Sequence, residues 1–566
     1  MIMKNKTFRT IILGVIFLVL SIFYTVLFAP NGNIRLMDSY DMLFHLNRIA
    51  SLGNIFQSPV NFDYWGHVGN MTSEFYPWVM VLPGFLIFQI IGNPVIGFFV
   101  FLTLITFATF VSAYYFMKKF SDNTLQSFLF SIIYTLSFFR MASVFYRAGL
   151  AEYTSYIFVP MLFYEFYQLL RGNFKKWPLF ALSFTLIVLT HPLTAFTTVI
   201  LMIPLILLVL FTKTAHSFSY WGKLILSGVG SIVLVGLTTV GFFLPMIQQQ
   251  LYVSVNRPAL LDLSATAKVP AALFKDALGT DLRNYSFGAI MLFAFLLLVI
   301  FIWKDKAKYR LIAAEMIIAL ILSTNIIPWD QLQNTFFNYM QFPWRFLNLF
   351  TFFASIYIAY GVTKIVDKRS PLLKLLVMVL ILAGCVNQVY VSGTQLNQRI
   401  TLAKHPSHIT VSDGDKYIKK FAQKDYYPVR SLYFAKDLSK HYFVVNGERE
   451  KLPFETTQNT YTVNYFSQKP ETIDFPVLVY KGLDVRINNE PAKYKISDRG
   501  TALIETKPGQ NKIVLRYRYS AVAKASLGLN IVGFILLAWL IYNQGRFLPV
   551  KKGETVEEKS LEKVEK

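Results

Sequence analysis

The sequence predicts a polytopic α-helical membrane protein of about twelve transmembrane helices, with an extracytoplasmic β-rich domain before the last helix. Three observations lead to this fold class. The 566-residue chain is 54% hydrophobic and only 15% charged, as expected for a protein with many membrane-spanning helices. Long apolar runs recur through residues 1–394. Residues 395–520 replace these runs with short alternating segments and a higher share of charge, and one further apolar run follows.

The apolar runs approach the length of about 20 helical residues that a bilayer requires. The first run follows three basic residues and has no small-residue cleavage site, so we expect a retained helix rather than a signal peptide. The stretch 76–91 contains Pro77 and Pro83, and we expect it to be re-entrant or interfacial. The predicted spans lie near residues 11–29, 94–117, 125–139, 154–170, 177–190, 194–211, 222–244, 286–303, 310–327, 344–363, 374–392 and 525–543.

The net charge of +23 is explained by the loops between these runs. Lysine-rich loops fall on one side of the predicted topology, which the positive-inside rule makes cytosolic. Both termini are then cytosolic, including the charged tail at 547–566 that follows the last helix at 521–546. The first outer loop, 30–93, and the β-rich domain are expected to be extracytoplasmic. This placement of the basic residues indicates a protein of the cell membrane, and it argues against nucleic acid as the partner that the positive charge serves.

The β-rich domain is predicted from alternation of apolar and polar residues. Phe475–Tyr480, Leu483–Ile487 and Lys512–Tyr519 are typical of strands. Asn488-Asn489 and the run 508–511 supply the turn residues between strands. The last helix would tether this domain to the membrane.

The first outer loop begins with a polar cluster. If residues 37–48 are helical, Asp38, Asp41 and His45 share one face, because residues three and four apart lie one above the other. Apolar residues fall on the opposite side, as in a helix lying on a membrane surface. The carboxylates could act as a base or as metal ligands, and the alternative is a solvated loop helix with capping acids.

Arginine predominates among the membrane-proximal cations of the predicted outer side. Its planar guanidinium binds phosphate through two hydrogen bonds, whereas lysine acts as a point charge. Each arginine could instead reach the phosphate of an ordinary lipid. The candidate anion-binding residues are Arg48, Arg140, Arg147 and Arg345, and the candidate substrate-binding residues are Glu74, Tyr76, Glu152 and His191.

Several short motifs resemble those of membrane-embedded GT-C glycosyltransferases. The first is Asp41-x-x-x-His45-Leu46-x-Arg48-Ile49, soon after the first span. The set also resembles the YfhO-type and pyruvoyl-tetrahydropterin-synthase-related bacterial membrane proteins, and the β-rich domain followed by one last helix is similar to that of YfhO-type proteins. The supporting motifs are Phe75-Tyr76-Pro77, Arg147-x-x-x-Ala151-Glu152, Thr190-His191-Pro192 and Gln341-Phe342-Pro343-Trp344-Arg345-Phe346.

The resemblance implies a sugar donor linked to polyprenyl phosphate, such as undecaprenyl phosphate. The acceptor would be a cell-envelope glycan, teichoic acid or protein on the outer face. Asp41 would be the general base, with inversion at the anomeric carbon. The family pattern does not fix the role of Asp38, which could hold a divalent cation (Mg or Mn) together with Asp41 or cap the helix. Glu74 and Glu152 are the candidates for the second acidic motif that such enzymes often carry.

Two other functions fit parts of the pattern. A transporter or flippase of lipid-linked saccharides would need arginines and a cavity, with acids buried within its spans; Glu315 is the main midspan acid. A non-catalytic envelope protein would use the β-rich domain to bind wall polymers. The sequence contains no Walker loop, dinucleotide-binding fingerprint or metal-spaced His/Cys cluster, which argues against ATP-driven or redox chemistry.

Overall fold

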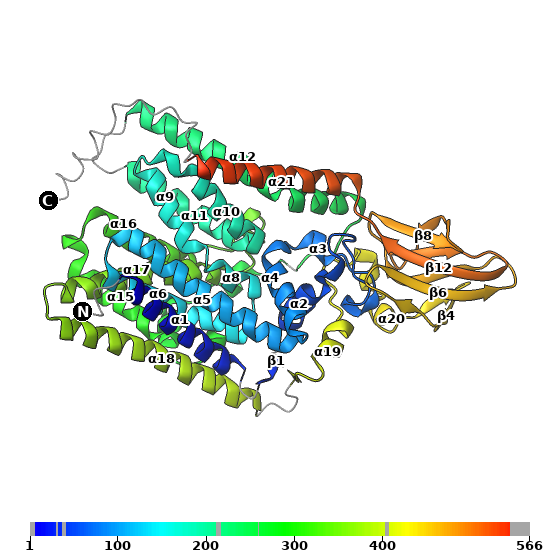
Figure 1. The fold of residues 1–566 in the computed structure, drawn as a ribbon, viewed down its shortest axis with the longest axis horizontal. Coiled ribbons are helices and arrows are strands. Elements are labelled where there is room, and N and C mark those ends of the chain that lie inside the picture. The colour runs from blue at the N-terminus through cyan, green and yellow to red at the C-terminus, as the bar shows by residue number, and fades with distance from the viewer. Residues whose placement is uncertain are drawn as a thin grey trace.

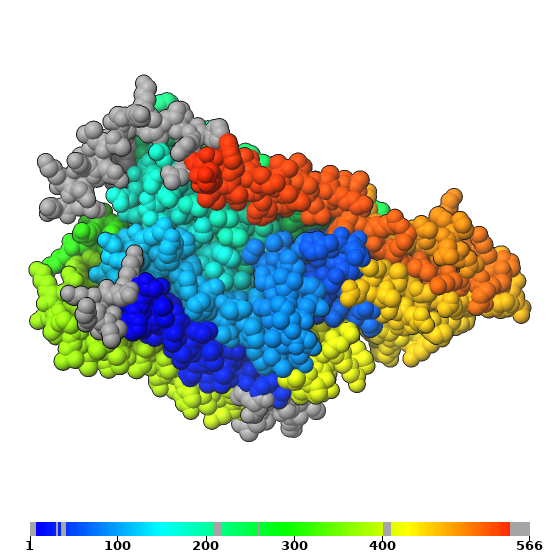
Figure 2. Space-filling model, viewed as in Figure 1, coloured from blue at the N-terminus to red at the C-terminus, as the bar shows by residue number. Residues whose placement is uncertain are grey.

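The computed structural model describes residues 6–29, 32–36, 41–210, 217–258, 260–401 and 407–543. A body of long helices makes up most of the molecule, and the β domain extends from one end of it (Figure 1). In the space-filling view the strands of residues 443–517 project beyond the helices as a separate lobe (Figure 2). The chain is therefore a multi-pass membrane protein with a β domain before its last helix, as the composition predicted.

Seven helices among the described residues are long and apolar enough to cross a membrane. Four of them keep most of their residues out of the protein core, which suits lipid as solvent, whereas the span Thr124–Tyr146 is wholly buried inside the body. They are α1 (Lys6–Phe28), α5 (Pro94–Ser121), α6 (Thr124–Thr135) with its continuation to Tyr146, α12 (Phe218–Tyr252), α17 (Phe346–Val366) with its leading turn from Pro343, α18 (Pro371–Thr401) and α21 (Ala521–Tyr542).

The remaining helices are shorter, because proline, glycine and polar turns interrupt the apolar runs. All twelve predicted runs contain helix, but five of them form helices below the length or apolarity of a full span, so the number twelve stays a prediction. These shorter helices are α2 (Asp41–Ala50), α3 (Thr72–Phe75), α4 (Leu82–Ile91), α8 (Leu150–Ser155), α9 (Val159–Leu170), α10 (Trp177–Thr190), α11 (Pro192–Leu210), α13 (Leu263–Thr266), α14 (Pro270–Ala277), α15 (Leu292–Phe301), α16 (Ala307–Leu322), α19 (Gly414–Lys420) and α20 (Ala435–Ser439).

The β domain consists of two five-stranded antiparallel sheets, in the orders β10-β11-β7-β3-β4 and β5-β6-β12-β8-β9. The three predicted strands are confirmed as β7, β8 and β12. Helix α18 continues past the predicted boundary at residue 394, and α19 and α20 precede the sheets. The strands are β3 (Phe443–Val445), β4 (Glu448–Glu450), β5 (Glu455–Thr456), β6 (Thr460–Ser467), β7 (Thr472–Leu478), β8 (Leu483–Ile487), β9 (Glu490–Pro491), β10 (Tyr494–Ile496), β11 (Thr501–Glu505) and β12 (Gly509–Tyr517).

The first outer loop joins the helical body to the β domain. Phe62, Val68 and Phe75 of this loop belong to the same buried core as the sheet residues Phe475 and Val477. Nearer the membrane, β1 (Ile34–Leu36) pairs antiparallel with β2 (Ser407–Ile409), so the segment before α2 is tied to the segment after α18. The loop is therefore held between two parts of the chain that lie far apart in sequence.

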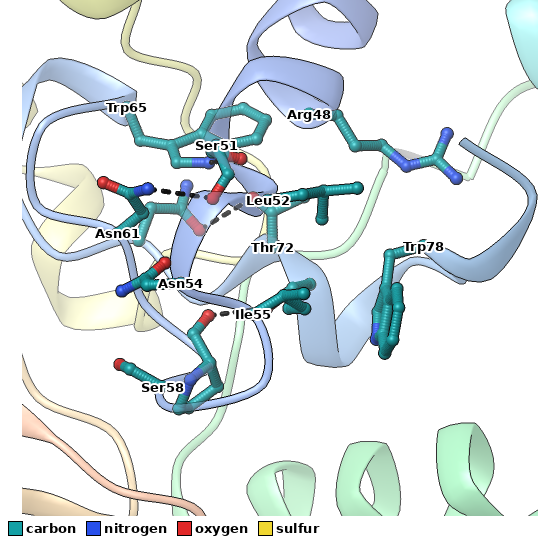
Figure 3. Close-up of a pocket in the computed structure, with 13 residues that line it drawn as sticks. Arg48, Ser51, Leu52, Asn54, Ile55, Ser58, Asn61, Trp65, Thr72 and Trp78 are labelled. Carbon is teal, nitrogen blue, oxygen red and sulfur yellow. Dashed lines mark hydrogen bonds between the residues drawn. The ribbon is translucent and has the colours of Figure 1, made fainter. Parts of the chain in front are cut away.

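Asn54 is the centre of this attachment. Its amide nitrogen lies 2.8 Å from the carbonyl oxygens of both Val60 and Gln458 and 2.9 Å from the side-chain oxygen of Asn459. Figure 3 shows Asn54 and Asn61 in the same polar cluster, from which Arg48 extends away. The cluster joins the loop to the β5–β6 turn.

We expect Asn54→Ala to loosen the β domain, because several buried carbonyl and amide groups would lose their donor. The expected loss in free energy of unfolding is about 1–3 kcal/mol. Thermal unfolding and the rate of limited proteolysis between the domains would measure it. Asn464→Ala, at an exposed position of β6, is the matched control; equal behaviour of the two variants would contradict the attachment.

The two ends of the described chain lie on the side of the helical body away from the β domain. Figure 1 shows α1 starting there and α21 ending there. Loops predicted to be cytosolic also meet one another: the Lys308 ammonium donates to the Phe120 carbonyl at 3.3 Å, and Lys364 pairs with Asp305 at 2.8 Å. The side of the membrane on which they lie stays a prediction.

Candidate active site

Helix α2 carries the predicted catalytic residues and begins at Asp41. It is buried on nearly every side, among α4, α5, α8 and α19. The expectation of a helix lying on the membrane surface is therefore wrong, since segments of the β-domain side cover the face that would meet lipid. Asn47 illustrates this cover, because its amide donates to the Ile418 carbonyl at 2.5 Å. Asp38 lies outside the described residues.

Asp41 faces a chain of opposite charges. Its carboxylate lies 3.6 Å from the Arg147 Nε, and its side chain remains 39% exposed. Arg147 also pairs with Glu152 at 2.5 Å, and Arg345 approaches the same Glu152 oxygen at 3.6 Å. Glu152 is only 2% exposed. The structure thus brings together one accessible carboxylate and two arginines that share a buried carboxylate.

A break in the helix that begins as α6 places Arg147 in this cluster. The helix continues as α7 (Phe138–Met141) and then as a π-helix (Ala142–Tyr146). Ala148 follows in the left-handed region at φ 57°, which ends the helix and turns the chain into α8. The Glu152 carboxylate, in the first turn of α8, also lies 3.4 Å from the Ser143 hydroxyl of the π-helix.

Three stacked aromatic rings form a wall beside the arginines, and the sequence analysis had not assigned them to the site. Trp344 stacks on Tyr285 with centroids 4.5 Å apart and on Phe342 at 4.7 Å. The Arg147 guanidinium lies 5.4 Å from the Trp344 ring, and the Arg345 guanidinium lies 5.1 Å from the Phe342 ring. Phe342 and Trp344 belong to the quoted motif around Arg345, but no sequence signal pointed to Tyr285.

His45 and Arg48 form the inner side of the site. The Arg48 guanidinium donates to the Pro77 carbonyl oxygen, lies 3.3 Å from His45 Nδ1 and stacks 4.1 Å from the Tyr76 ring centroid. Burial, with the charges of Arg48 and Arg147, holds the pKa of His45 well below its ordinary value. His45 is thus neutral at pH 7 and accepts from Arg48, which fixes Arg48 over Tyr76.

His191 lies at the same end of the bundle. It follows α10, is buried, and its Nδ1 lies 2.7 Å from the Thr194 hydroxyl. The Thr194 hydroxyl lies 3.3 Å from that of Ser155, which donates to the Glu152 carbonyl at 2.6 Å. His191 is therefore connected to the Glu152 helix through two hydroxyl groups.

Two predicted residues lie apart from this cluster. Arg140 is 0% exposed, donates to the Thr135 carbonyl and the Thr106 hydroxyl at 3.2 Å each, and lies over the Tyr24 ring. It stabilises the helix bundle and does not join Arg147. Glu74 is the second of these residues. Its carboxylate accepts a hydrogen bond from a side chain of α12, at the end of that helix next to the β domain.

Asp425 is an acid outside α2 whose charge acts on Asp41, a link that sequence reasoning missed. It precedes two tyrosines in the segment between α19 and the sheets, and Gln423 donates to its carboxylate at 2.5 Å. Burial raises the pKa of Asp425, and the negative charge of nearby Asp41 raises it further. No residue pattern near position 425 indicates an electrostatic influence from a helix almost 400 residues earlier.

The described residues contain no group of three or more His, Cys, Asp or Glu side chains arranged to hold a metal ion. The partner for Asp41 proposed from the sequence, Asp38, is not among the described residues. A divalent cation at this site stays a prediction.

Comparisons with known proteins add the following. No curated protein matches the chain. A solved structure that matches is the single-particle cryo-EM structure of the arabinofuranosyltransferase AftD from Mycobacteria, with 11% identity and a TM-score of 0.44. The match covers 68% of this chain and 26% of that one, so the chain spans about a quarter of the length of AftD. The model of a family of unknown function, DUF6541, matches residues 4–417. Because this match covers more than half of the sequence, the chain belongs to the DUF6541 family.

Proposed function

We propose that the chain is a membrane glycosyltransferase that moves a sugar from a polyprenyl-phosphate-linked donor to a cell-envelope acceptor. The observation that carries the proposal is the juxtaposition of Asp41 with Arg147 and Arg345 at one end of the membrane helices. A lipid-linked donor presents its phosphate at the bilayer surface. A glycosyltransferase of this kind therefore needs phosphate-binding cations and a base at that surface, and the position of Asp41, Arg147 and Arg345 supports such a role.

In this reaction Asp41 takes the proton of the acceptor hydroxyl, whose oxygen attacks the anomeric carbon of the donor sugar. The bond from that carbon to the phosphate oxygen breaks, and the configuration inverts. The leaving phosphate gains negative charge, which Arg147 and Arg345 stabilise. Glu152 does not contact the phosphate in this scheme; it holds the two guanidinium groups toward the same point.

The donor also changes the environment of the base. Arg147 is paired with Asp41, and this contact lowers the basicity of the carboxylate. A donor phosphate that binds Arg147 competes with Asp41 for it and offsets that effect. Asp41 thus becomes a stronger base once the donor is bound.

The pH dependence of transfer should report Asp41. Burial raises the pKa of Asp41 above its ordinary value of 3.8, although Arg147 and Arg345 oppose the rise. The base acts in its ionised form, so kcat/KM should fall about tenfold per pH unit below that pKa and level off above it. A rate profile from pH 4 to 9 would measure this. An activity that instead rises on acidification would contradict the role of Asp41.

The proposed function is tested by comparing the cell-surface glycans of a deletion strain with those of the wild type by mass spectrometry. We expect one monosaccharide decoration to disappear and to return with the wild-type gene but not with the Asp41→Asn gene. Unchanged glycans in the deletion strain would contradict the proposal. The sugar and the acceptor would follow from the lost decoration.

A transporter of lipid-linked saccharides is the second candidate, and Glu315 is the observation that favours it. This carboxyl group lies buried within α16, and neither of its oxygens has a hydrogen-bond partner among the described residues. Buried acids within spans are typical of transport pathways. Reconstituted protein would separate the two: a transporter moves the intact lipid-linked sugar across vesicles, whereas a transferase releases polyprenyl phosphate.

A further inference from the structure

A hollow lies between the first outer loop and the helix pair α12–α21. About 20 Å³ of it is open to a group the size of a water molecule. None of its lining residues belongs to the Asp41–Arg147–Glu152–Arg345 cluster. The residues that line it are Ser73, Glu74, Trp78, Gly241, Phe242, Pro245, Tyr519, Ala523 and Leu527.

The hollow adjoins a lipid-facing surface. Both α12 and α21 are long and apolar enough to span the membrane, and they pack side by side along one edge of the body (Figure 1). Leu244 and Ile247 of α12 and Val522 of α21, which flank the lining residues in sequence, are exposed. These helix ends are the ones next to the β domain, so the hollow lies at the corresponding membrane surface.

The oxygen atoms that line the hollow are acceptors. The Ser73 hydroxyl donates its hydrogen to the Pro59 carbonyl at 2.5 Å, and the Tyr519 hydroxyl donates to the Ile55 carbonyl at 2.6 Å. Each therefore has only lone pairs left to offer. Glu74 adds a carboxylate, and its side chain is 7% exposed. Among the side chains of this lining, the Trp78 indole alone retains an N–H group to donate.

Glu74 has no counterion among the described residues. Its one hydrogen bond comes from the Gln249 amide at 2.8 Å. Lys481 meets Gln249 through its main chain, while its ammonium lies over the Tyr252 ring. Lys524 of α21 is exposed to solvent. Burial raises the pKa of Glu74 to about 7, and the Gln249 hydrogen bond offsets this only in part.

We propose that this hollow binds the primary ammonium head group of a bilayer lipid. An ammonium carries three N–H donors, no acceptor and a positive charge, which matches a hollow of acceptor oxygens around an uncompensated carboxylate. The rings of Trp78 and Phe242 favour a cation near their faces. The apolar residues of α12 and α21 provide the wall along which the rest of the lipid would lie.

The test uses the purified full-length chain, titrated with lipids and followed by native mass spectrometry. Phosphatidylethanolamine should bind about tenfold more tightly than phosphatidylcholine, whose trimethylated nitrogen has no N–H donor. Because the carboxylate must be ionised, binding should be tighter at pH 8 than at pH 6. Glu74, Tyr519 and Lys524 are the titratable side chains around the hollow, and burial places the pKa of Glu74, at about 7, between these two pH values.

Glu74→Gln should abolish the preference between the two lipids while its amide oxygen still accepts from Gln249. Glu448→Gln, at an exposed site of β4, should keep the preference. If Glu74→Gln does not fold, Tyr519→Phe replaces it in the same binding test. This variant should weaken phosphatidylethanolamine binding at least about threefold. Equal binding of both lipids, or a preference that survives Glu74→Gln, overturns the proposal. Equally tight binding of free phosphoethanolamine overturns the assignment to a bilayer lipid.

Discussion

Asp41→Asn should lower sugar transfer by about 10³-fold while expression and donor binding stay at the wild-type level. The asparagine has the shape of the aspartate but accepts no proton from the acceptor hydroxyl, and general-base catalysis contributes about 10²–10⁴-fold. The fold should tolerate the change, because the Asp41 side chain is partly exposed and contacts Arg147 at 3.6 Å. Release of polyprenyl phosphate by the purified protein would measure the loss.

Asp415→Asn is the matched control. Asp415 lies on the neighbouring helix α19, is exposed, and pairs with Lys419 within that helix. Its replacement should leave transfer unchanged. If the Asp41 variant retained activity close to that of the Asp415 variant, Asp41 would not be the base.

Arg147→Lys should reduce kcat/KM for the lipid-phosphate donor by about 100-fold, which corresponds to about 2.7 kcal/mol at the transition state. Lysine keeps the charge but loses the planar pair of donors that a phosphate requires. Because the substituted ammonium and Arg345 would both stay near Glu152, its carboxylate would not be left without a counterion. Donor titration at saturating acceptor would measure the effect.

Arg171→Lys serves as the comparison for this substitution. Arg171 caps α9 and lies over the Tyr167 ring, away from the Asp41 cluster. We expect it to behave like the wild type. If Arg147→Lys left the donor KM and kcat unaltered, Arg147 would not bind the donor phosphate.

The fold could be predicted from the sequence to a large extent because its determinants are local. An apolar run indicates a span wherever it occurs, and Leu483–Ile487 alternates regularly enough to predict β8 with its observed bounds. The attachment of the β domain could not be predicted. It depends on Asn54 reaching a turn 404 residues later, and such a contact leaves no local pattern.

The candidate active site could also be predicted only in part, although the contacts that decide it lie closer together in the sequence. Arg140 and Arg147 flank one aromatic segment and are seven residues apart, so a regular α-helix would place them on one face. The π-helix between them adds a residue to the turn, and Arg147 leaves the helix toward Asp41 while Arg140 stays among Thr106 and Tyr24. Nothing in the residue types distinguishes the two arginines. Asp425 escaped notice for a related reason, since its position depends on how the segment after α19 packs over α2.

The central claim is that a lipid phosphate binds between Arg147 and Arg345, beside Asp41. An experimental structure of the full chain with polyprenyl monophosphate bound tests it most directly. We expect the phosphate oxygens within hydrogen-bond distance of both guanidinium groups, with the Asp41 carboxylate facing the position of the donor sugar. A phosphate bound at the opposite end of the helices, or out of reach of Asp41, would contradict the account.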